Sequence, residues 1–139
     1  MCVKVLITLL SEKAYFGQIE KEVESRVGTE LHLESESVSS RPLTFSISEP
    51  GAGCGCSLVV DTADWAESAW RFKPEKVSVI EESVAAIAAL ARNDFRFSVA
   101  WLGPDRPDAC EKTISLHDLL AAIRESRIVP GCEYQVAAV

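Results

Sequence analysis

The most constraining feature of the sequence is a change in hydrophobic period near residue 94. Before it, apolar residues recur at spacings of three and four, which place one stripe along a helix. This stripe consists of Val77, Ile80, Val84, Ile87 and Ala91. After it, four apolar residues alternate strictly, as in a strand with one buried face. These are Phe95, Phe97, Val99 and Trp101. A helix followed at once by a half-buried strand indicates helices packed on a sheet.

The remainder of the second half continues this mixture of elements. A short apolar run predicts a strand at residues 56–60, and alternation predicts another at residues 133–138. Residues 111–114 are expected to return beside the strand that begins at Phe95. Ser115 and Asp118 stand three apart ahead of an apolar stripe, a variant capping box that predicts a last helix.

Residues 56–138 therefore read as strand, helix, strand, strand, helix, strand. This βαββαβ order is that of the ferredoxin-like sandwich, in which two helices cover one face of an antiparallel four-stranded sheet. The similarity is in element order alone. It predicts no function, because that fold carries many unrelated activities.

The first half predicts further strands and one helix. Alternating apolar residues indicate strands at residues 3–10, 31–33 and 43–47, and apolar spacing of four indicates a helix that ends at Gly28. We predict a single α+β domain over residues 1–139. Its mainly antiparallel sheet has about six or seven strands with helices on one face, and residues 1–50 form an acidic extension of that sheet.

Acidic residues are concentrated in the first half of the chain. The net charge is −7, and residues 1–70 alone carry eleven acidic and five basic residues, a net charge of −6. A sequence-independent nucleic-acid binder needs a basic face, so we expect no nucleic-acid partner. Adsorption to an anionic membrane is excluded for the same reason. A basic protein is the partner that this charge favours.

The cysteines and the N-terminal segment bear on the compartment. The chain has five cysteines, an odd number that is too sparse for a disulfide scaffold. The apolar run after Lys4 is too short for a membrane span and lacks a cleavage pattern, so it reads as a buried strand rather than a signal peptide. We therefore predict a cytoplasmic protein with reduced thiols.

A glycine-cysteine loop is the sharpest local feature. Residues 49–56 read Glu-Pro-Gly-Ala-Gly-Cys-Gly-Cys, with two thiols at Cys54 and Cys56. Glycines at alternate positions are typical of a structural loop. Two thiolates would also supply half of a zinc or copper site, although no second close pair of Cys or His follows. A Cys-Gly-Cys redox pair is the other alternative. No cofactor is expected unless these thiols bind metal.

A second cluster follows at residues 61–70. Three carboxylates three residues apart would share one face of a short helix, as a cation site or, more commonly, as a solvated face. These are Asp61, Asp64 and Glu67. Trp65 and Trp70 lie among them and predict an interaction surface, or packing at the rim of the core. With Trp101 they could also line a ligand pocket.

No nucleophile elbow, phosphate-binding loop or zinc-protease motif occurs in the sequence. We therefore predict a non-enzymatic binding or protein-interaction domain that engages a basic partner through its acidic first half. The alternatives are a metal or redox protein that uses Cys54 and Cys56, and a small-molecule-binding domain or enzyme with a tryptophan-lined pocket. An open sheet has edge strands, so a homodimer is a further expectation.

Overall fold

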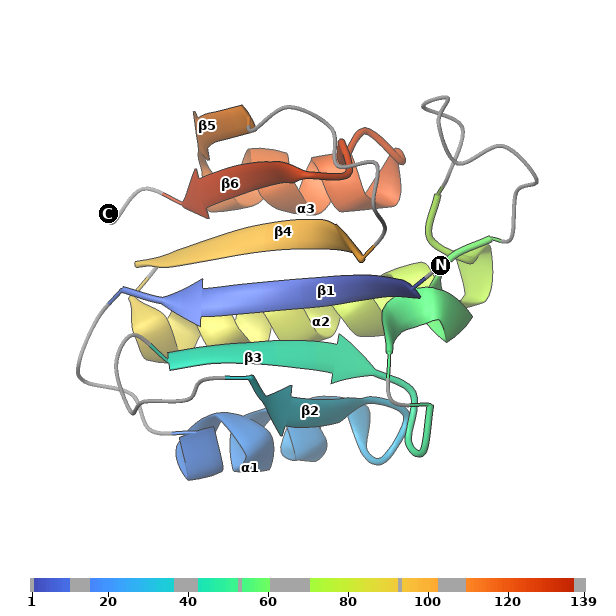
Figure 1. Ribbon diagram of the computed structural model, residues 1–139. Coiled ribbons are helices and arrows are strands. Elements are labelled where there is room, and N and C mark those ends of the chain that lie inside the picture. The colour runs from blue at the N-terminus through green and yellow to red at the C-terminus, as the bar shows by residue number, and fades with distance from the viewer. Residues whose placement is uncertain are drawn as a thin grey trace.

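The computed structural model describes residues 2–10, 16–36, 43–52, 54–60, 71–92, 94–102 and 110–136. Within these ranges the chain forms three α-helices, one short 3-10 helix (η1) and six strands (Figure 1). In chain order they are β1 (Cys2–Leu9), α1 (Phe16–Val27), β2 (His32–Ser35), β3 (Leu43–Ser48), η1 (Gly55–Leu58), α2 (Pro74–Ala91), β4 (Phe95–Leu102), β5 (Cys110–Ile114), α3 (Leu116–Arg124) and β6 (Cys132–Val136).

The six strands form one mixed sheet in the order β2-β3-β1-β4-β6-β5. Four of the five neighbouring pairs are antiparallel, and β5 runs parallel to β6. α3 connects that parallel pair, because parallel neighbours need a crossover connection. The helices lie on one side of the sheet, with α2 between α1 and α3 (Figure 1). The prediction of an α+β fold is confirmed.

The core lies between the sheet and the helices. Odd-numbered residues of β1 face it, and Val5 and Ile7 are fully buried. Their partners across the β1–β4 ladder, Val99 and Phe97, face the same core. Each large apolar side chain buried in this way contributes about 1.5–3 kcal/mol. The alternation seen in the sequence thus sets which face of the sheet the helices cover.

The helix boundaries follow local signals in the sequence. α2 begins at Pro74, and its C-cap residue Arg92 is left-handed, with φ of 53°. The Ser115 side chain accepts a hydrogen bond from the backbone N–H of Asp118 at 3.1 Å, as the capping box predicts. Gly28, with φ of 66°, ends α1. No helix in the described part of the chain has the length and apolar character needed to cross a membrane.

The predicted strand at residues 56–60 is wrong. Residues 55–58 form η1, and only Val59 makes an isolated bridge, to Phe72. Leu58 and Val59 are 0% and 1% exposed, so the apolar run reflected burial rather than extended backbone. The described part of residues 56–138 therefore contains five of the six predicted elements. The predicted pairing of residues 111–114 with the strand that begins at Phe95 is wrong, because β6 lies between β4 and β5 and β5 runs parallel to β6.

The expectation that all thiols are reduced is wrong for one pair. Cys110 and Cys132 form a disulfide that joins β5 to β6. The two residues stand directly opposite each other in the parallel register, with their Cα atoms 4.4 Å apart, within the range that a disulfide spans. The argument from reduced thiols to a cytoplasmic location loses this support.

The Cys110–Cys132 bond should contribute measurably to stability. It closes a loop with a sequence separation of 22 residues, and loss of that constraint on the unfolded chain is worth about 3 kcal/mol. Adding a dithiol reductant should lower the free energy of unfolding by that amount in urea titrations. The Cys110→Ala, Cys132→Ala double variant should not respond to reductant. Equal stability of the oxidised and reduced wild type would contradict a structural bond.

Candidate functional site

The structure describes some of the predicted site residues and not others. Cys54 and Cys56 are described; both are in the thiol form and half-buried, at the start of η1. Trp101 belongs to β4, where its backbone stands opposite Val3, but its side chain is not described. The remaining predicted residues lie outside the described ranges: Asp61, Asp64, Trp65, Glu67 and Trp70.

The glycine-cysteine loop packs against the start of β1. The backbone N–H of Val3 donates a hydrogen bond to Cys56 Sγ at 3.2 Å, beyond the point where β3 stops pairing with β1. A Cβ atom on Gly55 would lie 3.2 Å from the carbonyl oxygen of Val3 and 3.3 Å from the nitrogen of Val5. Gly55 and Cys56 therefore have a structural use, which is to seat η1 against a strand.

Metal ligands do not gather in the described structure. Among the residues that it describes, no three or more His, Cys, Asp or Glu side chains lie together in a way that would hold a metal ion. The zinc or copper hypothesis for Cys54 and Cys56 remains a prediction.

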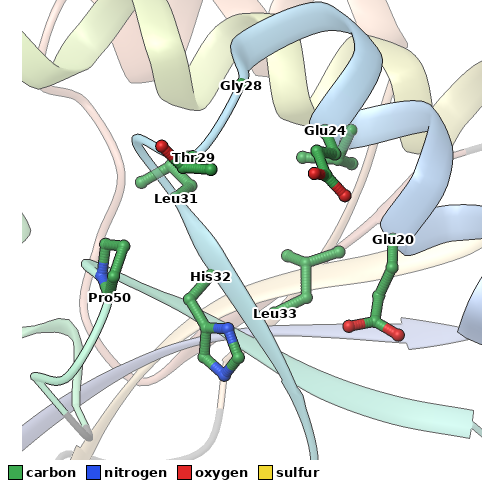
Figure 2. Close-up of a pocket in the computed structure, with 9 residues that line it drawn as sticks. Glu20, Glu24, Gly28, Thr29, Leu31, His32, Leu33 and Pro50 are labelled. Carbon is green, nitrogen blue, oxygen red and sulfur yellow. The ribbon is translucent and has the colours of Figure 1, made fainter.

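A groove lies where α1 meets the outer strand β2 (Figure 2). Its volume is about 250 Å³. It is bounded by one face of α1, the turn after this helix, the first half of β2 and the turn after β3. The lining residues are Glu20, Val23, Glu24, Gly28, Thr29, Leu31, His32, Leu33 and Pro50.

The groove combines an apolar floor with an acidic wall. Leu31 and Leu33 are 7% and 5% exposed and belong to the core. Glu20 and Glu24 are exposed and stand one turn apart on α1, as Figure 2 shows. Within the described residues, neither carboxylate forms an ion pair with a Lys or Arg side chain.

Two basic residues near the groove form ion pairs with glutamates that do not line it. Arg26 Nε lies 3.1 Å from Glu22 Oε1 on the same helix. Lys4 Nζ, on β1, lies 2.7 Å from Glu36 Oε2 at the end of β2. Residues 16–36 carry six glutamates against two basic residues, so the groove lies at an acidic end of the molecule.

A second hollow, of about 190 Å³, lies at the opposite edge of the sheet on β4, β5 and β6. Its lining residues are Arg96, Glu111, Lys112, Thr113, Glu133 and Gln135. This lining mixes both signs of charge, and Arg96 lies 3.8 Å from Glu133. Of these two, the α1–β2 groove has glutamates but no Lys or Arg among its described lining residues.

Sequence reasoning missed His32, Glu20 and Glu24 as groove residues. The structure places His32 on β2, where it lines the groove together with Pro50 (Figure 2). The available signal was the spacing of four between Glu20 and Glu24 on a predicted helix that precedes a predicted strand. That spacing indicates a shared helix face, but not that the face overhangs an outer strand.

Comparisons with protein-family models, with curated proteins and with solved structures find no match for this chain. The groove is therefore interpreted from its own chemistry.

Two glycines provide a matched test of the packing of η1. Gly55→Ala should destabilise the fold by about 1–3 kcal/mol, because the new Cβ crowds the β1 backbone. Gly17→Ala, in α1, meets nothing within 4 Å and should stabilise the fold by about 0.4–1 kcal/mol. Thermal unfolding of both variants provides the comparison. Equal effects from the two substitutions would show that η1 does not press on β1.

The ion pair between Lys4 on β1 and Glu36 at the end of β2 should make the stability of the fold depend on pH. The Lys4 hydrogen bond lowers the pKa of Glu36, the Ser46 hydroxyl adds to this effect, and partial burial opposes it. Because this pKa is lower folded than unfolded, the stabilisation is complete above the unfolded value and is lost as pH falls through the folded value. The stability gap between wild type and Glu36→Gln should therefore narrow below about pH 4.5. Urea titrations from neutral to acidic pH measure this difference in stability. A difference that does not change with pH would show that ionised Glu36 does not stabilise the fold.

Proposed function

We propose that this chain is a non-enzymatic binding domain that engages a basic protein through the α1–β2 groove. The observation that carries the proposal is the groove itself. Its two wall carboxylates, Glu20 and Glu24, form no ion pair within the described structure, and its floor is apolar. Charge and shape are thus combined at one place in the acidic half of the chain.

A lysine or arginine side chain has the chemistry that this groove favours. Its aliphatic stem buries apolar surface while its head keeps its charge near water. Leu31 and Leu33 offer the floor for the stem, and Glu20 and Glu24 offer acceptors for the head. The surplus negative charge around the groove would mainly raise the association rate and the specificity for a basic partner.

The alternative functions have less support. The side chains of Trp65, Trp70 and Trp101 lie outside the described part of the structure, so the tryptophan-lined pocket stays a prediction. Cys56 Sγ accepts the Val3 N–H bond, which gives this thiol a use that needs no metal or redox partner. A thiol site also remains a prediction, which the Cys56 contact does not favour.

Two double variants that each remove two negative charges test the proposal. The probe is fluorescently labelled decalysine, and the Kd is measured by anisotropy at about 20 mM and about 300 mM salt. The Glu20→Gln, Glu24→Gln variant should bind about five- to tenfold more weakly at low salt, because two surface charges are lost. The control is Glu111→Gln, Glu133→Gln, which removes the same charge at the opposite edge of the sheet.

The control variant should keep nearly wild-type affinity, and high salt should weaken binding in every case. Equal weakening by the two variants would show that the probe senses only net charge, which contradicts recognition at the groove. Absence of binding to the wild type at low salt would also overturn the proposal.

A further inference from the structure

The outer edge of β2 presents backbone groups that the sheet does not use. β2 is the terminal strand and pairs only with β3 among the described strands. The N–H of Glu36 donates to the carbonyl of Thr44 at 2.8 Å, which continues the antiparallel register. Since hydrogen-bonded residues alternate along such a ladder, the backbone groups of Leu33 and Ser35 point away from β3.

The groove follows this same edge. Leu31, His32 and Leu33 line it on the strand side, and Glu20 and Glu24 overhang it from α1 (Figure 2). α1 runs alongside β2 (Figure 1). Within the described structure, the outward backbone groups of β2, the apolar floor and the acidic wall therefore lie at the same edge of the sheet.

We propose that this edge binds an extended, lysine- or arginine-bearing peptide, which adds to the sheet as an antiparallel strand beside β2. The inference rests on the proposed function and specifies the form of its partner. Strand addition would satisfy the outward N–H and C=O groups of Leu33 and Ser35. A helix offers no free backbone groups along its length, so it would leave them unsatisfied.

The side-chain spacing of such a strand matches the acidic wall. Alternate residues of an antiparallel strand point to the same face and are about 6.8 Å apart. Residues four apart on a helix are separated by about 6 Å along its axis, which is the separation expected for Glu20 and Glu24. A peptide with cations at alternate positions would therefore present two of them to these two carboxylates.

Charge disfavours a second copy of this chain as the occupant. Two β2 strands paired across a two-fold axis would bring together two edges that each carry Glu20, Glu24 and Glu34. Like charges opposed across neighbouring strands are destabilising. A basic segment meets complementary charge at the same place.

Backbone methylation of the peptide provides the decisive test. The probe is the heptapeptide Val-Lys-Val-Lys-Val-Lys-Val, capped at both ends. Directly opposed residues share a face of the sheet, so a lysine opposite Leu33 would face α1 and direct its own N–H toward β2. N-methylation of the lysines should weaken binding at least tenfold, and N-methylation of the valines should leave it within about twofold. Retained binding by the N-methyl-lysine peptide would overturn antiparallel strand addition.

A pair of variants at Ser35 tests the protein side. Ser35 is exposed and its N–H points outward, so Ser35→Pro removes that donor and leaves the β2–β3 ladder bonds in place. It should weaken peptide binding about tenfold with an unchanged circular dichroism spectrum, whereas Ser35→Ala should bind as the wild type does. If the wild type sediments as a dimer that Ser35→Pro dissociates, a second copy covers the edge and the proposal fails.

The outcomes separate this inference from the proposed function. If N-methylation has no effect while Glu20→Gln, Glu24→Gln still weakens binding, the groove attracts cations without strand addition. If that double variant binds the heptapeptide as tightly as the wild type, recognition at the groove itself is wrong. Strand addition is supported only when N-methylation of the lysines and the Ser35→Pro substitution both weaken peptide binding, while N-methylation of the valines and Ser35→Ala do not.

Discussion

The pairing of β1 with strands on both of its sides is the constraint on which the rest of the structure depends. β3 and β4 flank it, so the early and late parts of the chain share one sheet. The buried face of β1 fixes both registers, because a slip of one residue would turn Val5 and Ile7 toward solvent. η1 then packs where β3 leaves β1. β2 lies at the edge of the sheet because it pairs with the side of β3 that faces away from β1.

Much of the architecture could be predicted from local periodicity. The stripe that ends at Ala91, the cap at Ser115 and the left-handed glycine at residue 28 all act over a few neighbouring residues. The strand predicted at residues 56–60 failed because an apolar run indicates burial without specifying backbone conformation. The Cys110–Cys132 bond depends on a register between strands that are distant in sequence, and no local pattern contains that register.

The candidate site was predictable only in its chemistry. The charge count located an acidic first half, but the groove arises because Glu20 and Glu24 on α1 overhang the edge of β2. That relation depends on how the helix packs on the sheet. The glycine-cysteine loop drew attention as a metal or redox site, yet its described contacts, made through Gly55 and Cys56, are those of close packing on a strand.

The two edge strands of the sheet, β5 and β2, differ in covalent linkage and in the charges around them. A disulfide joins β5 to β6 and residues of both charges line that edge, whereas the edge at β2 carries Glu34 and is flanked by Glu20 and Glu24 of α1. An outer strand with free backbone groups is a template for uncontrolled polymerisation. If this edge binds a basic peptide as proposed, the same carboxylates would also oppose its pairing with an identical molecule. Solubility and recognition would then be under the same selection, and a substitution that neutralised this edge would impair both.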